Sequence, residues 1–267
     1  LPDGEIKLQS ALIATPEKCY LPEEISNGSR YWGVSLQLYS LRSQHNWGIG
    51  DLGDLRTLTK SLGKQGASFI GLNPLHALPA HDGTTFSPYS PVSRLASNYL
   101  YLDLSMIEDF RDSSAAQAFA NSKDTREKLD KLRHADFVDY GKVSEVKMQA
   151  LNLAYEQFYK VHLGNNSSRA QSFREFCTQR GKALRNYAIY QALREHFITK
   201  DPALWGWPVW PEGYKNPDDK LVGAFVNSEE KRVLFFCYLE WQFSVQMQSL
   251  KQELRDNGIH HGLYLDF

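Results

Sequence analysis

The chain has 267 residues, 42% of them hydrophobic and 13% aromatic, which is enough for one large domain or two modest ones. Its 30 lysines and arginines balance 31 acidic residues, so the net charge of −1 argues against nucleic acid or a membrane surface as a partner. No apolar run is long enough to span a membrane, and the three cysteines lack the spacing of a disulfide framework or a zinc site, which favours a reducing cytoplasm.

The first residues, 1–25, are predicted to be the end of an upstream β-rich domain and a linker. Residues 8–15 (LQSALIAT) are apolar and favour a short strand, whereas prolines and the turn sequence SNGS at 26–29 are typical of a linker. The chain also begins without methionine, which suggests that a preceding domain has been removed.

Residues 26–104 are predicted to form the first strands and rim loops of a barrel. Residues 32–38 and 68–72 have the apolar character of strands, and a leucine stripe at three- and four-residue spacing predicts a helix between them. Asp51 is the expected N-cap, with Asp54 in a capping-box position, and Gly66 is the expected C-terminal stop. Strand, helix and strand make a right-handed βαβ unit, which suits an α/β barrel or a doubly wound sheet.

A long loop from Asn73 to about Ser97 follows the second strand. Loops of this length inside a compact domain are usually functional or disordered, and its bulky side chains favour function. Residues 99–104 (YLYLDL) alternate and predict a further short strand.

Residues 105–258 are predicted to be a large helical insertion and a barrel helix, because apolar residues recur every three or four positions. A Trp- and Pro-rich break interrupts this region at 205–214. The last helix is expected to begin at Asn227 or Ser228 and to end at Gly258. Residues 259–267 are then the start of a third barrel strand.

Some residues could carry chemistry or merely support the fold. The proline-flanked Tyr89 could stack on a sugar or pack in its loop, and Asp266, at a strand end, could be functional or ordinary. The tryptophans Trp205, Trp207 and Trp210 could form a stacking platform or a packing cluster.

Metal and nucleotide sites have little support in the sequence. His76 and His81 are close together, but no third ligand has suitable spacing, and the glycines near residue 50 match no nucleotide-binding motif. We therefore expect no metal.

The combination of motifs resembles the amylomaltases, 4-α-glucanotransferases of the (β/α)8-barrel type. The matching segments are QLYSLRS, NWGIGDLGDL, FIGLNPLHAL, SPYSPVSR, NYLYLDL, VDY, WGWPVWPE and GLYLD. The resemblance implies an α/β fold, here a partial (β/α)8 TIM barrel with a helical insertion. It also implies transfer of α-1,4-glucan segments between maltodextrins with retention, through a covalent glycosyl-enzyme and without a cofactor.

The resemblance also assigns residues. Tyr89 corresponds to the tyrosine that stacks on the sugar, Ser87 to the neighbouring hydroxyl, and Asp266 to a carboxylate that organises the same subsite. Asn73 and Asn98 are expected to be architectural, and Arg42 and Asp51 to fix the first rim loop.

The family's catalytic carboxylates lie in motifs of the kind RxDH, GEDLG and THD, and none occurs in these residues. We therefore expect an N-terminal fragment that lacks them, that is inactive alone, and that could self-associate through an exposed barrel edge. Two alternatives remain open: an α-glucan hydrolase of the same clan, and a non-catalytic maltodextrin-binding module.

Overall fold

The computed structural model describes residues 12–19, 21–79 and 86–266, and its contacts divide the chain into Leu1–Tyr31 and Trp32–Phe267. The described part of the first unit contains the short helix α1 (Glu23–Ser26), and residues 12–16 have no regular structure. The strand predicted at 8–15 is therefore wrong for residues 12–15, and residues 8–11 lie outside the described residues.

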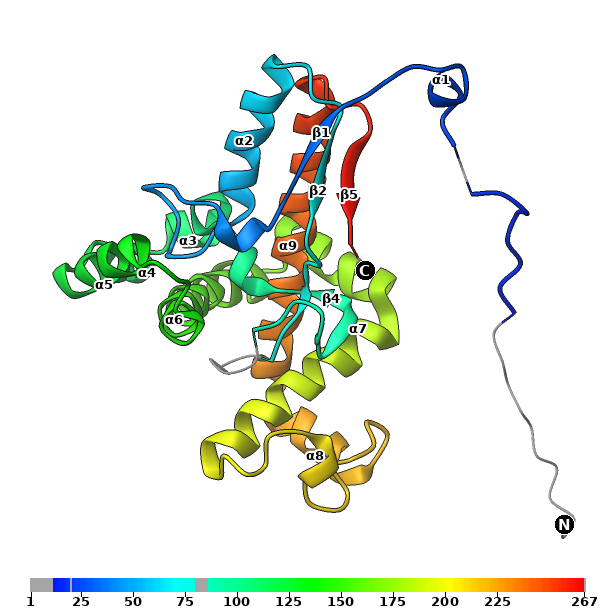
Figure 1. Ribbon diagram of the computed structural model, residues 1–267. Helices are drawn as coiled ribbons and strands as arrows, with labels where there is room; N and C mark the ends of the chain where they lie inside the picture. Colours follow the sequence, from blue (N-terminus) through cyan, green and yellow to red (C-terminus); the bar gives the residue numbers. More distant parts are fainter. Residues whose placement is uncertain (1–11, 20, 80–85, 267) are drawn as a thin grey trace, which may run out of the picture. The chain divides into compact units, whose positions relative to one another are not determined.

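The second unit is built on a parallel sheet of the three predicted strands: β1 (Gly33–Leu36), β2 (Phe69–Leu72) and β5 (Gly262–Leu265) (Figure 1). The strand order is β1-β2-β5, and the register aligns Leu36 with Leu72 and Leu72 with Leu265. Because the strands are parallel and in register, the residues that follow all three meet at one edge.

The helix α2 (Leu52–Lys64) connects β1 to β2 and begins as predicted. The Asp51 carboxylate accepts hydrogen bonds from the backbone N–H groups of Gly53 (3.0 Å) and Asp54 (3.3 Å), and the Asp51 N–H donates to the Asp54 carboxylate at 3.1 Å. This reciprocal capping box satisfies N–H groups that the first turn leaves free. After the helix, Gly66 has φ of +81°, the left-handed conformation expected of a C-terminal stop.

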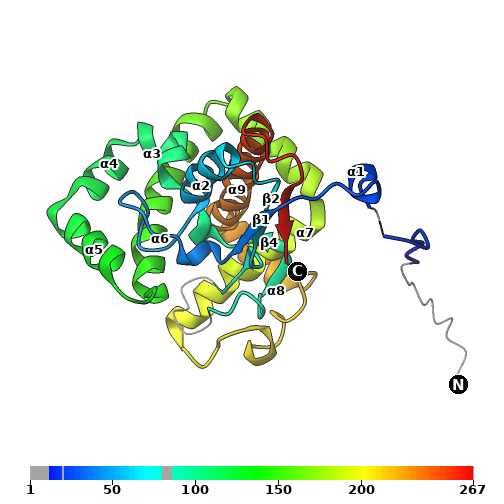
Figure 2. The same ribbon diagram turned by 45° about the horizontal axis from the view of Figure 1, so that its top comes forward.

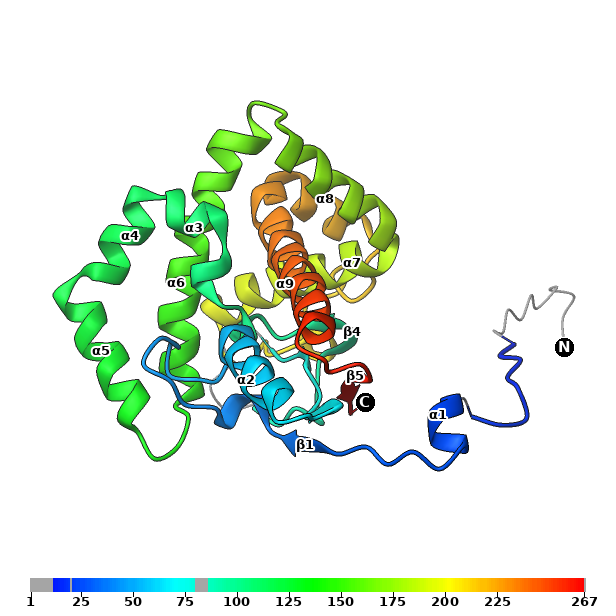
Figure 3. The ribbon, with the colours of Figure 1, turned by 90° about the horizontal axis from the view of Figure 1, so that it is seen from above.

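The helix α9 (Glu230–Asp256) lies beside α2 on the same face of the sheet (Figure 3). Its predicted N-cap is wrong, because Asn227 and Ser228 belong to the preceding helix α8 (Lys220–Ser228), and Glu229 precedes α9 without a capping side-chain bond. Its predicted end is confirmed, since the helix stops just before Gly258, whose φ is +80°.

The predicted helical region between residues 105 and 200 is helical. Helices α3 to α6 lie together on one side of α9 (Figure 2). The elements are α3 (Glu108–Asp112), α4 (Ser114–Asn121), α5 (Lys123–His134), α6 (Tyr140–Phe158), the π-helical turn η4 (Tyr159–Leu163) and α7 (Ser168–Lys200), followed by the 3₁₀ turn η5 (Trp207–Val209). None of the helices within the described ranges is long and apolar enough to cross a membrane.

The strand predicted at 99–104 is wrong. Two 3₁₀ turns occupy this segment, η2 (Tyr99–Tyr101) and η3 (Leu104–Met106), after a first such turn, η1 (Leu38–Ser40), that follows β1. The side chains of Asn98 and Asp103 cap the two turns by accepting bonds from Leu100 N (3.0 Å) and Ser105 N (2.9 Å). Such local side-chain bonds compete with a strand ladder, and here they replace it.

The long loop after β2 contains a small antiparallel pair, β3 (His76–Ala77) with β4 (Ser93–Ser97). This hairpin lies near the carboxyl end of the parallel sheet (Figure 1). It therefore holds both ends of the segment that carries Ser87 and Tyr89.

Candidate functional site

The carboxyl ends of the parallel strands are tied together by Asn73, the residue that follows β2. Its side-chain oxygen accepts a 2.7 Å bond from Leu38 N beyond β1, and its amide nitrogen donates to the Pro74 carbonyl (2.8 Å) and to the Tyr101 hydroxyl (3.2 Å). Asn73 is only 6% exposed. These bonds support the architectural role predicted for it, because they fix the two loops that leave β1 and β2.

The predicted residues Tyr89 and Asp266 are in contact. The Tyr89 hydroxyl donates a 3.1 Å hydrogen bond to Asp266 Oδ2, although 177 positions separate them in the sequence. Asp266 directly follows β5, and its backbone N–H continues the sheet by donating to the Leu72 carbonyl at 3.2 Å. The bond to this carboxylate, with slight desolvation and the carboxylate's charge, raises the pKa of Tyr89 above its usual value of 10.0, so the phenol stays neutral at physiological pH.

The ring of Tyr89 is accessible, with 63% of the residue exposed. The residue lies in a turn closed by a 3.1 Å bond from Ser90 N to the Ser87 carbonyl, between two prolines. The turn and the Asp266 bond together orient an exposed aromatic ring, which is the arrangement that stacking on a flat ligand requires.

Ser87, the third predicted residue, lines a cavity of about 740 Å³ beside this turn. The aromatic walls of the cavity include Tyr39 and Phe86, and both contact Tyr140. Phe86 stacks on Tyr140 with ring centroids 5.2 Å apart, and Tyr39 meets it edge-on at 6.5 Å. The loop after β1, the loop after β2 and the start of α6 therefore meet in an aromatic groove with a serine hydroxyl at its border.

The hairpin behind Tyr89 is held by two charged side chains from two long helices, one buried and one exposed. Glu240 of α9 accepts a 2.8 Å bond from Ser97 N, and Arg180 of α7 donates to the Leu95 carbonyl at 2.6 Å. Glu240 is 4% exposed, and burial raises its pKa to about 7. The spacing of apolar residues in α9 gave no sign of this role, because the bond depends on the tertiary fold.

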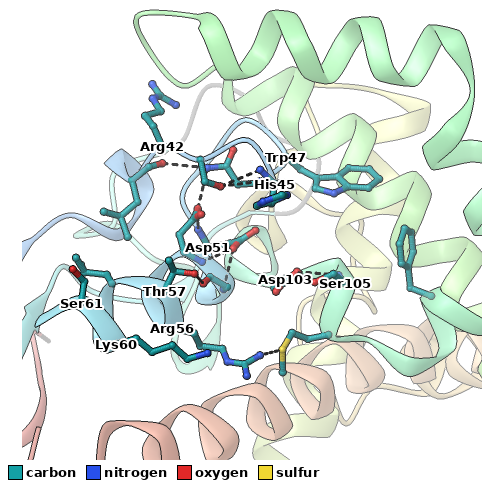
Figure 4. Close-up of a pocket in the computed structure, with 18 residues that line it drawn as sticks. Arg42, His45, Trp47, Asp51, Arg56, Thr57, Lys60, Ser61, Asp103 and Ser105 are labelled. Atoms are coloured by element: carbon teal, nitrogen blue, oxygen red, sulfur yellow. Dashed lines mark hydrogen bonds between the residues drawn. The ribbon is translucent and has the colours of Figure 1, made fainter. Parts of the chain in front are cut away.

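A second cavity, of about 700 Å³, lies between the loop after β1, α2 and η3 (Figure 4). Its acidic groups already have structural partners: Asp51 and Asp54 cap α2, and Asp103 accepts bonds from both the N–H and the hydroxyl of Ser105. Arg42, predicted to fix this loop, donates to the Ala135 carbonyl at 3.4 Å. We therefore regard the cavity as structural.

Lys147 of α6 is a buried cation next to this cavity. It is fully buried, and its ammonium donates to the carbonyls of Leu100 (2.6 Å) and Leu102 (2.8 Å) and lies 3.5 Å from Asp51 Oδ2. Burial lowers the pKa of Lys147 and raises that of Asp51 to about 7. The signal in the sequence was a lysine on the apolar face of α6, four residues after Val143 and four before Leu151.

The three tryptophans, which were also candidates for a sugar site, differ in how deeply they are buried. Trp210 is 3% exposed and packs against Tyr190 and Phe197 at 5.5 and 5.4 Å between ring centroids, whereas Trp205 and Trp207 are more than half exposed. His81 lies outside the described residues. Among the residues that are described, no cluster of three His, Cys, Asp or Glu side chains could hold a metal ion.

Comparison with known proteins identifies similar chains. A family model described as 4-alpha-glucanotransferase, of glycoside hydrolase family 77, matches residues 36–266. A 4-alpha-glucanotransferase of Haemophilus influenzae is 31% identical over 258 residues, which are 96% of this chain and 37% of that protein. This chain therefore spans little more than a third of the length of that relative.

Two solved structures have a similar fold. An amylomaltase from Corynebacterium glutamicum matches with a TM-score of 0.69 at 24% identity, over 90% of this chain and 30% of the other. An amylomaltase from Streptococcus agalactiae, in complex with acarbose, matches with a TM-score of 0.65 at 21% identity, over 86% of this chain and 42% of the other. With the parallel β1-β2-β5 sheet, these matches confirm the predicted α/β class and the partial (β/α)8 barrel.

Proposed function

The chain belongs to the 4-alpha-glucanotransferase family, and from this membership we propose that the protein transfers α-1,4-glucan segments between maltodextrins, with retention at the transferred carbon. In such a reaction a carboxylate holds the glycosyl group covalently until a sugar hydroxyl displaces it. In our proposal the residues described here bind and orient the sugar. No cofactor is required by this chemistry.

The observation that carries the proposal is the hydrogen bond between Tyr89 and Asp266. It places an exposed, oriented aromatic ring and a carboxylate side by side at the carboxyl edge of a parallel sheet, where (β/α)8 enzymes bind their substrates. We assign Tyr89 to stacking on a glucose ring, Asp266 to accepting a sugar hydroxyl while holding Tyr89, and Ser87 to a hydrogen bond at the border of the aromatic groove. The acarbose bound to the S. agalactiae amylomaltase supports a sugar ligand.

The aromatic groove of Tyr39, Phe86 and Tyr140 extends this surface. A glucose ring has one relatively apolar face, and aromatic rings are suited to cover it. A groove next to the Tyr89 turn supports binding of a chain of several glucose units, such as a maltodextrin derived from glycogen or starch.

The test is product analysis with maltotriose on the whole protein that contains these residues, because the family's catalytic motifs are absent from them. A transferase converts maltotriose into glucose and longer dextrins, so total reducing ends stay constant, whereas a hydrolase of the same clan increases reducing ends. Constant reducing ends with a ladder of longer products support the proposal, and net hydrolysis contradicts it. A module that only binds sugar would bind maltotriose without converting it into other products.

We also propose a cytoplasmic location, supported by free thiols at Cys19, Cys177 and Cys237. Fractionation of the source cells with a cytoplasmic marker tests it.

Within the described residues the outer edges of β1 and β5 have no paired strand, and we propose that a second copy of the chain can pair there. A concentration-dependent mass in light scattering supports this pairing, and a constant monomer mass contradicts it.

A further inference from the structure

Cys177 and Cys237 come together from two different helices. Cys177 lies on α7 and Cys237 on α9, and both thiols line a cavity of about 530 Å³ between these helices and the end of α8. The charged residues Arg185 and Glu230 line the same cavity. Neither the sugar site nor the barrel sheet makes use of this pair.

The two thiols differ in a way that suits stepwise oxidation. Cys177 is only half-buried, while Cys237 is 6% exposed, so a small reagent meets Cys177 first. A hydrogen bond from the Cys237 thiol lowers the pKa of Cys177, and the same bond, with burial, raises the pKa of Cys237. The accessible sulfur is thus the better nucleophile, because the thiolate is the reactive form of cysteine.

The backbone beside Cys177 is interrupted. Gly181, one helical turn further along α7, has φ of +57° and ψ of −141°, which breaks the helix, and it also lines the cavity. An added Cβ there would meet no atom within 4 Å, so the position needs glycine for its backbone conformation rather than for space. A disulfide requires specific Cα and Cβ distances. Because the helix is interrupted at Gly181, the segment with Cys177 can adjust toward α9 to meet them.

We propose that Cys177 and Cys237 form a reversible disulfide when hydrogen peroxide enters this cavity. The Cys177 sulfur attacks a peroxide oxygen, the O–O bond breaks, one water leaves, and Cys177 becomes a sulfenic acid. The Cys237 sulfur then attacks the Cys177 sulfur, the S–O bond breaks, the S–S bond forms, and a second water leaves. Two thiols and one hydrogen peroxide therefore give one disulfide and two waters, and a dithiol reductant reverses the change.

The disulfide would act on the hairpin behind the sugar site. Three residues after each cysteine comes an anchor of that hairpin: Arg180 on α7 donates to the Leu95 carbonyl, and Glu240 on α9 accepts from Ser97 N. Drawing α7 toward α9 shifts both anchors of β4 at once. This consequence rests on the proposed function, and it predicts that oxidation raises the KM for maltotriose severalfold with little change in kcat.

The experiment uses the Cys19→Ser variant, in which Cys177 and Cys237 are the remaining cysteines of these 267 residues. The protein is treated with hydrogen peroxide, the free thiols are alkylated, and the peptides are mapped by mass spectrometry without reduction. We expect loss of both alkylation sites, a peptide pair joined through Cys177 and Cys237, and recovery of both sites after dithiothreitol. An oxidised protein that keeps both alkylation sites, or that carries a stable sulfinic acid at Cys177, overturns the proposal.

Two further variants test the order of the steps. In Cys237→Ser the sulfenic acid at Cys177 should persist, and dimedone should trap it. In Cys177→Ser the remaining thiol, Cys237, should still be alkylated after peroxide treatment. Faster oxidation of Cys237 than of Cys177 contradicts the assigned roles. The mass readout is independent of activity. A disulfide in a whole protein that shows no glucan transfer would count against the proposed function alone, and a disulfide with an unchanged KM would count against the link to the hairpin.

Discussion

The Tyr89 hydroxyl and Asp266 Oδ2 lie 3.1 Å apart, and their hydrogen bond joins the long loop after β2 to the residue that ends β5. Both side chains are exposed, so the bond contributes little to the stability of the fold. Its effect is on position, because it holds an otherwise free ring at the edge of the sheet.

Replacing Tyr89 should therefore affect transfer much more than folding. Tyr89→Ala removes the ring, and in the whole protein we expect kcat/KM for maltotriose to fall by about a hundredfold or more, the scale of a lost positioning contact. Tyr89→Phe keeps the ring and loses only the bond to Asp266, so its loss should be severalfold. Circular dichroism and the melting temperature should match the wild type in both variants. Turnover of Tyr89→Ala close to that of the wild type would remove Tyr89 from the site.

Glu240 should give the protein a pH-dependent stability. Burial raises its pKa from the usual 4.5 to about 7. Its contribution to the free energy of unfolding is therefore fully present below about pH 4.5 and is lost as the pH rises through about 7. Across this range the free energy of unfolding should fall by about 3 kcal/mol. Glu240→Gln keeps the acceptor for Ser97 N but cannot ionise, and its unfolding free energy should be flatter between about pH 5 and pH 8.

Urea unfolding at several pH values measures this difference. Asp51, whose pKa is also raised to about 7, contributes in the same direction in both proteins, so subtraction of the two curves isolates Glu240. Glu127→Gln, on the exposed face of α5, is the matched control and should follow the wild type. Identical pH dependence of the wild type and Glu240→Gln would show that Glu240 does not titrate in this range.

Lys147 should be important for folding because it serves several acceptors at once. Lys147→Met leaves the buried Asp51 carboxylate and the carbonyls of Leu100 and Leu102 without their cation, and removal of one partner of a buried pair costs about 3–5 kcal/mol. Lys142→Met, five residues earlier on α6, removes an exposed lysine paired with Asp139 and should unfold like the wild type. Equal urea midpoints for the two variants would contradict the structural role of Lys147.

The sequence predicted those parts of the fold that local rules determine. Strands β1, β2 and β5 and the capping box of Asp51 and Asp54 follow from short apolar runs and from side chains that bond to nearby backbone. The family resemblance then placed Tyr89 and Asp266 on the rim, but their contact across 177 positions could only be seen in the structure.

The errors arise where distant residues override a local pattern. Residues 99–104 alternate like a strand, yet Asn98 and Asp103 cap two turns there and Lys147, from α6, binds the carbonyls that a neighbouring strand would need. Glu240 presents the same difficulty, because a buried carboxylate has meaning only once Ser97 is beside it.

The two readings of the tryptophan cluster can be separated by a matched pair of substitutions. Trp210 is 3% exposed, and its indole N–H donates to the Leu204 carbonyl at 3.1 Å, so Trp210→Ala should lower the unfolding free energy by about 3–5 kcal/mol. Trp207 is 56% exposed, so Trp207→Ala should lower the unfolding free energy by less than about 0.5 kcal/mol. Maltodextrin affinity measured by calorimetry decides its role: unchanged affinity in Trp207→Ala means that the cluster serves packing through Trp210, whereas a clear loss means that the exposed ring is a platform for sugar.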